Sequence, residues 1–287
     1  MRIAVTGSTG RLGNQVVGLL ARSSASSPHE VLALARRPSV VPAVHASDTV
    51  TAVHADYDDL GSLESALYGV DALVFVSSDG DAARMMIHHE NVVRAADTCG
   101  VGHVVYLSGV DVDPASPFCY AFTNGYTERL LARTRCGYSF ARASLFTEFF
   151  ASFLRPALSS GELRVPAGSG RVAIVSRSDV GRALAALAVL PPSGRHHDLT
   201  GPTALSLDDM AEVLTEVAGR SVSYADVSPE VHVEELARLG EQPWWIYAYS
   251  TMFASVREDR WSTVSDEVLR LTGRVPTSVA DMAGRFA

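Results

Sequence analysis

The sequence predicts an α/β protein: a doubly wound parallel sheet over residues 1–143, followed by a smaller α/β lobe over residues 144–287. Short β-branched segments alternate with amphipathic helical segments in the first half, and such alternation requires parallel crossover connections. A glycine-rich turn, TGSTGRLG, joins the first strand segment to the first helical segment. After Ser144 the alternation gives way to aromatic and mostly helical segments. Together these features predict a Rossmann-like dinucleotide-binding domain with a substrate lobe.

Six strands and four helices are expected in the first domain. The strands cover 2–7, 31–36, 49–56, 70–78, 102–109 and 138–144. The helices have apolar residues at three- and four-residue spacing and cover 12–24, 60–69, 81–100 and 124–137. Asp58 and Asp59 are expected to cap the helix at 60–69.

The second half predicts a smaller, mostly helical lobe that is interleaved with the first domain. The segment 145–158 is apolar and aromatic, and helices are expected at 178–190 and 206–219, with Ser206 capping the second of these. Two short strands are expected around a glycine-rich turn within 161–176, with others at 196–202 and 220–228, and most of the remainder is helical. The strands near 171–176 and 197–201 are expected to return to the first domain's sheet or its edge.

Composition excludes several classes of function. The net charge of -8 comes without a basic block, so we expect no nucleic-acid partner. No apolar run reaches membrane-spanning length and no signal-peptide pattern opens the chain, so we expect no membrane association and a cytoplasmic location. The three cysteines are scattered, and adjacent histidines on a helix point about 100° apart, so we expect no metal site.

The glycine turn is expected to hold the phosphates of a dinucleotide. Gly7, Gly10 and Gly13 fall where the chain must turn tightly, admit a pyrophosphate to bare backbone, and pack a helix against a strand. A simple flexible turn is the alternative. The cofactor-binding residues expected here are Gly7, Ser8, Thr9, Gly10, Arg11, Leu12 and Gly13.

Two arginines favour NADP(H) over NAD(H). An acidic residue after the second strand is typical of NAD sites, but Arg36 and Arg37 stand at that point. Paired guanidinium groups suit a 2′-phosphate. The alternative is that both are solvated surface side chains.

Other loops at the carboxyl edge of the sheet complete the expected site. Asp56 and Tyr57 follow the third strand and are expected near the adenine. The ribose and nicotinamide are expected to lie beside the ends of the fourth and fifth strands, at Ser77, Ser78, Ser108 and Gly109.

Catalysis is harder to locate because the chain contains no lysine. Many short-chain dehydrogenases pair a tyrosine acid with a lysine four residues later, and that pair is absent. The remaining candidates near the nicotinamide are Ser108, Tyr126 and Ser144. Phe146 and Phe149 follow the sixth strand and are candidates for stacking a flat substrate, although most such aromatic side chains are core.

The segments TGSTGRLGNQVV, LARRP, ADYDD, HHENVVRAADTCGVGHVVYLS and LTGPTALSLDDMAEVL together resemble the NmrA-like branch of atypical short-chain dehydrogenases. The likeness is greatest to the type 2 NAD(P)H:quinone oxidoreductases and spans essentially the whole chain. It implies NADPH bound across the glycine turn and quinone reduction without a tyrosine–lysine pair. The family often has Asn-Gly where this chain has Ala143 and Ser144, so cofactor binding carries over better than quinone specificity.

Three functions remain open at this point. The leading hypothesis is an NADPH-dependent oxidoreductase that acts on a quinone or similar aromatic or conjugated carbonyl. A non-catalytic NADP(H)-sensing regulator of the NmrA type is the alternative from another class. A tailoring ketoreductase of aromatic natural-product biosynthesis is the third. A homodimer is the candidate assembly, although the sequence does not fix the oligomeric state.

Overall fold

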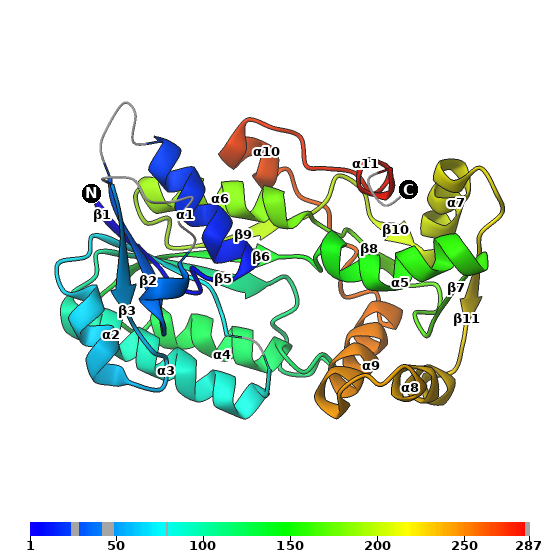
Figure 1. The fold of residues 1–287 in the computed structure, drawn as a ribbon, viewed down its shortest axis with the longest axis horizontal. Helices are drawn as coiled ribbons and strands as arrows, with labels where there is room; N and C mark the ends of the chain where they lie inside the picture. The colour runs from blue at the N-terminus through cyan, green and yellow to red at the C-terminus, as the bar shows by residue number, and fades with distance from the viewer. Residues whose placement is uncertain (24–28, 42–48, 79, 285–287) are drawn as a thin grey trace. The chain divides into compact units, whose positions relative to one another are not determined.

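The computed structural model describes residues 1–23, 29–41, 49–78 and 80–284, which form two compact units (Figure 1). The first unit comprises the described residues of Met1–Ser108 together with Thr123–Arg142 and Val180–His197. The second comprises Gly109–Phe122, Ala143–Asp179 and the described chain from Asp198 onward. The chain therefore crosses between the units several times.

The first unit is built on a seven-stranded sheet with the order β3-β2-β1-β4-β5-β6-β9. The strands are β1 (Arg2–Val5), β2 (Glu30–Ala35), β3 (Val50–His54), β4 (Ala72–Phe75), β5 (His103–Gly109), β6 (Gly137–Ala143) and β9 (His196–Leu199). Ile3 pairs in parallel with Val31 on one side and with Ala72 on the other. The strand order therefore reverses between β1 and β4, which is where doubly wound sheets bind ligands.

Helices cover both faces of this sheet, as Figure 1 shows, with α1 and α6 on one face and α2, α3 and α4 on the other. Their bounds are α1 (Arg11–Ser23), α2 (Leu60–Leu67), α3 (Ala82–Cys99), α4 (Ala121–Leu131) and α6 (Arg177–Val189). The central strands β1, β2, β4 and β5 are mostly apolar and buried, as parallel strands covered on both faces require, and Phe75 and Tyr106 are among their fully buried side chains. The predicted doubly wound sheet is confirmed.

Local sequence signals account for the ends of these helices. Asp81 caps α3 by accepting from the backbone of Ala83 and Arg84, and Gly100 ends it in a left-handed conformation. Asp59 caps α2 by accepting from the Ser62 N–H. The prediction that Asp58 also caps α2 was wrong, because its carboxylate pairs with other side chains described below.

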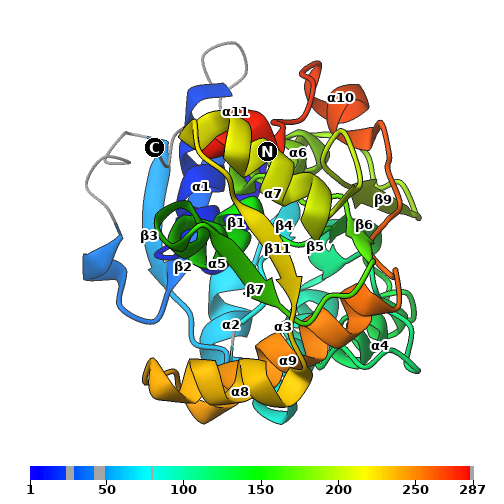
Figure 2. The ribbon, with the colours of Figure 1, turned by 90° about the vertical axis from the view of Figure 1, so that its right-hand side faces the viewer.

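The second unit contains two small sheets and several helices. In Figure 2, β7 (Glu162–Val165) and β11 (Ser223–Asp226) lie side by side, and they pair in parallel. The other sheet pairs β8 (Arg171–Val172) with β10 (Leu205–Ser206) in antiparallel fashion. The helices are α5 (Thr147–Ser160), α7 (Leu207–Ala218), α8 (Pro229–Arg238), α9 (Pro243–Arg257), α10 (Glu267–Thr272) and α11 (Val279–Ala283), and a short 3-10 helix, η1 (Pro38–Val40), belongs to the first unit.

The core of the second unit combines aliphatic side chains with the fully buried rings of Phe150, Phe253 and Trp261. The Trp261 indole N–H donates to the Ser255 hydroxyl at 2.8 Å, so burial leaves this polar group satisfied. Ser206 caps α7 through a capping box with Asp209, as its sequence predicts.

Two segments differ from the sequence-based expectation. The strand expected near 171–176 does not join the seven-stranded sheet: β8 pairs with β10, and the Ala173 and Val175 N–H groups donate to carbonyls of Trp261 and Leu145 within the second unit. Its backbone groups are therefore satisfied locally, whereas β9 does join the large sheet. The helix expected at 124–137 begins earlier and ends at Leu131, whose carbonyl accepts from the Thr134 hydroxyl. Ser24, the expected end of the first helix, lies outside the described residues.

Within the part of the chain that the structure describes, no helix has the length and apolar character needed to cross a membrane. The three cysteines are free thiols.

Candidate functional site

The glycine turn between β1 and α1 has a backbone that admits only glycine at two positions. Gly7 has a φ of +60, in the left-handed region. A Cβ on Gly13 would lie 2.3 Å from the Gly7 carbonyl oxygen, because α1 packs directly on the turn. Gly10 is less restricted, with 3.2 Å to the same oxygen, and its own N–H donates to that oxygen at 2.9 Å. The turn therefore holds the N-terminus of α1 close to the end of β1.

Side chains in the turn divide into anchors and exposed groups. The buried Ser8 hydroxyl donates to the Leu34 carbonyl at 2.8 Å and so fixes the turn to β2. Leu12 is buried, whereas Thr9 and Arg11 are exposed.

An unpartnered amide lies next to the turn. Asn14 follows it on α1, and its side-chain Nδ2 is buried with no hydrogen-bond partner among the described residues. Unpartnered donors are uncommon in folded proteins, and here one lies at a helix N-terminus, where anions are favoured. A pyrophosphate group fits both features: the bare backbone of the turn allows its close approach, and the Asn14 amide can donate to it.

Arg36 and Arg37 lie immediately after β2, between that strand and η1. Both are exposed, and within the described residues neither guanidinium forms an ion pair. The Ser8–Leu34 bond ties the glycine turn to the same end of β2. Two guanidinium groups without an ion-pair partner among the described residues have the charge and the donors to bind an anion.

The residues after β3 are largely committed to contacts within the first unit. The Tyr57 hydroxyl donates to the Val76 carbonyl at 2.7 Å, and its ring packs edge-on against Phe75. Burial raises the pKa of Tyr57, so it stays protonated. Asp56 accepts from the Asp58 N–H at 3.1 Å. An adenine base beside Tyr57 would therefore contact the tyrosine ring, because the hydroxyl proton is already donated to the Val76 carbonyl.

A hydrogen-bonded chain that was not foreseen from the sequence begins after β4. The Ser78 hydroxyl lies 3.0 Å from His88 Nδ1, and His88 Nε2 lies 3.0 Å from a carboxylate oxygen of Asp58. Asp58 also pairs with Arg84 at 2.6 Å, which lowers the pKa of its carboxyl. From the sequence Asp58 is expected to cap a helix, and no role is assigned to His88. The only signal was their position on elements that a parallel sheet brings to one edge.

The three candidate proton donors differ in their surroundings. Ser108, at the end of β5, is 5% exposed, and Ser144, after β6, is 3% exposed. Neither hydroxyl has a hydrogen-bond partner among the described residues. The Tyr126 hydroxyl instead donates to Glu90 at 2.6 Å, a bond that raises its pKa. Ser77 donates to the Leu107 carbonyl at 3.0 Å, and Gly109 is buried at the end of β5.

The two phenylalanines expected at a substrate pocket belong to the second unit. Phe146 is half-buried, and the Arg177 guanidinium lies 5.5 Å from its ring centroid. Phe149, on α5, packs against Tyr249 with ring centroids 5.1 Å apart. Among the described residues, no group of three or more histidine, cysteine or carboxylate side chains is arranged to hold a metal ion.

The strand order, the reversal beside β1 and the glycine turn define a Rossmann-like α/β protein. The chain belongs to the NmrA-like family, whose model matches residues 1–256.

Relatives of this chain include several reductases. Quinone oxidoreductase 2 of Escherichia coli K12 is 31% identical over 239 residues, covering 83% of this chain and 82% of the relative. An NAD(P)H azoreductase of Xenophilus azovorans is 28% identical over 288 residues, covering 99% and 98% of the two chains.

Solved structures extend the comparison. An NADPH-dependent quinone oxidoreductase of E. coli, solved with NADPH, has a TM-score of 0.91 at 28% identity and covers 99% of both chains. Triphenylmethane reductase of Citrobacter sp., solved with NADP(H), has a TM-score of 0.91 at 28% identity and covers 100% of both chains. The predicted family is confirmed.

Proposed function

We propose that this protein is an NADPH-dependent reductase whose acceptor is a quinone or a similarly conjugated carbonyl compound. The observation that carries the proposal is the glycine turn, which has no room for a Cβ at Gly13, together with the two arginines after the neighbouring strand that form no ion pair with any described residue. Relatives that reduce quinones, azo compounds and triphenylmethane dyes support the reductase class.

The residues of the first unit have separable binding roles in this proposal. Backbone N–H groups of the turn and the Asn14 amide bind the pyrophosphate at the N-terminus of α1. Arg36 and Arg37 bind the 2′-phosphate and so select NADPH over NADH. NADPH supplies a hydride when bound. Ser77 and Ser78 lie where a ribose is expected, and His88 holds the Ser78 hydroxyl in place.

Proton supply falls to weak donors, since the chain has no lysine. A quinone that receives one hydride needs one further proton to become a hydroquinone, and its reduced oxygen accepts that proton from a hydroxyl group or water. The Ser108 and Ser144 hydroxyls are the candidates, because neither is bonded to another described group. Tyr126 is a weaker candidate because its proton is engaged by Glu90. An easily reduced acceptor removes the need for a strong general acid.

A non-catalytic NADP(H)-sensing regulator is the second candidate. The observation that favours it is the absence of any tyrosine–lysine pair, together with the engagement of Tyr126 by Glu90. Such a protein binds NADPH and leaves it unoxidised, so turnover separates the two functions.

Steady-state loss of NADPH absorbance with a panel of acceptors tests the acceptor class. We expect menadione to support the fastest turnover, methyl red slower turnover, and the isolated ketone cyclohexanone almost none. The expected order follows reduction potential, because a hydroxyl-only site lacks the acid that an unactivated ketone needs. Heat-inactivated protein is the control. Turnover with cyclohexanone but not with menadione would indicate a ketoreductase instead. Tight NADPH binding without turnover of any acceptor would indicate the regulator.

A further inference from the structure

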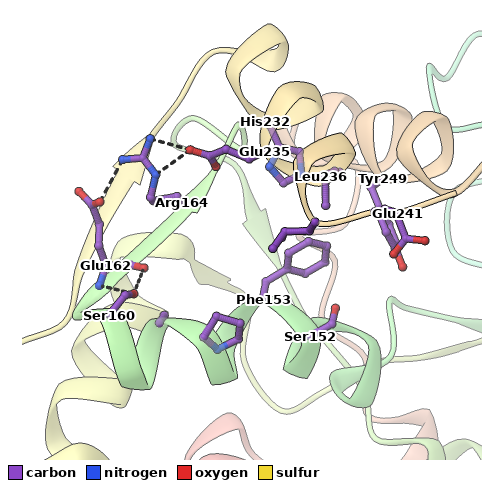
Figure 3. Close-up of a pocket in the computed structure, with 14 residues that line it drawn as sticks. Ser152, Phe153, Ser160, Glu162, Arg164, His232, Glu235, Leu236, Glu241 and Tyr249 are labelled. Carbon is purple, nitrogen blue, oxygen red and sulfur yellow. Dashed lines mark hydrogen bonds and ion pairs between the residues drawn. The ribbon is translucent and has the colours of Figure 1, made fainter. Parts of the chain in front are cut away.

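The second unit contains a cavity of about 370 Å³ that none of the proposed cofactor-binding residues lines (Figure 3). It is formed by side chains from α5, β7, α8, the turn after α8, and α9. Its volume falls within the range of small-molecule sites.

Apolar and aromatic groups form the walls of this cavity. Phe153 of α5 lies near its centre in Figure 3, with Leu236 of α8 beside it. The Tyr249 ring of α9 meets Phe153 edge-on, with centroids 5.4 Å apart. No described residue is hydrogen-bonded to the Tyr249 hydroxyl. These two rings offer both a face and an edge to a planar ligand.

A buried histidine of the cavity wall has unused hydrogen-bonding capacity. His232 of α8 is 3% exposed, and neither of its ring nitrogens has a partner among the described residues. Its neighbours are the rings of Phe153 and Phe253, at 6.0 and 5.3 Å between centroids. Burial lowers the pKa of His232, so the ring is neutral and presents one donor and one acceptor. Buried polar groups are nearly always hydrogen-bonded, so a ligand group that reaches this ring through a small shift of the cavity wall would supply a missing partner.

The charges at the cavity are predominantly negative. Arg164 is already neutralised, because its guanidinium pairs with Glu162 at 3.0 Å and with Glu235 at 2.9 Å. Glu241 has no cationic partner among the described residues, and its carboxylate accepts only the Gln242 N–H at 2.8 Å. In Figure 3 the Arg164 ion pairs and Glu241 lie on opposite sides of Phe153. Three carboxylates against one guanidinium favour a cationic ligand over an anionic one.

We propose that this cavity is a binding site for a small aromatic cation. The ligand's ring packs against Phe153 and Tyr249, its ammonium group pairs with Glu241, and a polar group of its ring system hydrogen-bonds to His232. The ammonium group also gains cation–π attraction from the tyrosine ring. The assignment depends only on residues of the second unit, so it stands or falls separately from the proposed reductase activity.

Calorimetric titration of the full chain with three indole compounds tests the charge and ring requirements. Tryptamine is the cationic probe, tryptophol has the same ring with a neutral hydroxyl, and indole propionate has the same ring with a negative charge. We expect tryptamine to bind about tenfold more tightly than tryptophol, and indole propionate to bind weakest. No measurable binding of tryptamine, or equal affinity for all three compounds, would overturn the proposal.

Two substitutions test the location of the site. Glu241→Gln is expected to reduce tryptamine affinity about tenfold while leaving tryptophol unchanged. His232→Phe keeps an aromatic ring in the wall and is expected to weaken both compounds. Glu234→Gln removes an exposed carboxylate from the same helix and is the matched control. Unchanged tryptamine binding in both cavity variants would place the ligand elsewhere and refute the assignment. Glu241→Gln should leave menadione-dependent NADPH oxidation at the wild-type rate.

Discussion

Replacing Gly13 with alanine is expected to abolish tight NADPH binding. The new Cβ would lie 2.3 Å from the Gly7 carbonyl oxygen, 2.6 Å from the Gly7 carbonyl carbon and 2.9 Å from the Thr6 carbonyl oxygen. All three are backbone atoms that cannot rotate away, so α1 must shift from the turn and its N–H groups lose their alignment. We expect NADPH affinity to fall about 100-fold or more, and the free energy of unfolding to fall by about 1–3 kcal/mol through overpacking.

Calorimetry with NADPH and denaturant unfolding measure these two effects for Gly13→Ala. Gly10→Ala is expected to be milder, since its Cβ would lie 3.2 Å from the same oxygen. Gly61→Ala is the matched control: its Cβ meets only a side-chain oxygen of Asp59 at 3.4 Å, and alanine favours the helix. Wild-type NADPH affinity in Gly13→Ala would show that the turn is not the phosphate site.

The double substitution Arg36→Ala and Arg37→Ala is expected to remove the preference for NADPH. Charge-assisted hydrogen bonds contribute about 1.5–3 kcal/mol each, so losing two groups on one phosphate should weaken NADPH binding by at least about 100-fold. NADH lacks the 2′-phosphate, so its affinity should remain within about twofold of wild type. Both side chains are exposed and unpaired within the described residues, so stability should not change.

Titration of the double variant with NADPH and NADH in parallel measures this preference. Arg94→Ala is the matched control, because Arg94 is an exposed arginine of α3 that forms no ion pair with any described residue. Raised salt should weaken NADPH binding to the wild type more than to the variant. An equal loss for both dinucleotides would make Arg36 and Arg37 bystanders and leave cofactor choice without an explanation.

The sequence predicts most of the first unit because its signals are local. Apolar runs of strand length, the cap at Asp59 and the left-handed Gly100 each depend on residues a few positions apart. The glycine turn is equally local, since Gly7 and Gly13 approach each other within the short loop that joins β1 to α1. Such features are readable without knowledge of tertiary contacts.

The features that were missed depend on contacts between residues far apart in the chain. His88 and Asp58 are separated by 30 residues in the sequence but lie within hydrogen-bonding distance. The Asp58 carboxylate, expected to cap a helix, instead belongs to a series of hydrogen bonds that runs through His88 to Ser78. The assignment of 180–197 to the first unit is likewise set by packing rather than by local pattern. His232 gives no signal in the sequence, because only the fold shows that both of its nitrogens lack partners.

A single-turnover experiment tests the central claim of NADPH-dependent quinone reduction most directly. Protein in excess over NADPH is mixed rapidly with menadione, and the absorbance of the bound NADPH is followed together with formation of the hydroquinone. We expect each bound NADPH to be consumed with formation of one hydroquinone, faster than in a protein-free mixture, and we expect Gly13→Ala to lose this acceleration. Bound NADPH that persists in the presence of menadione, at the protein-free rate or slower, would contradict that claim.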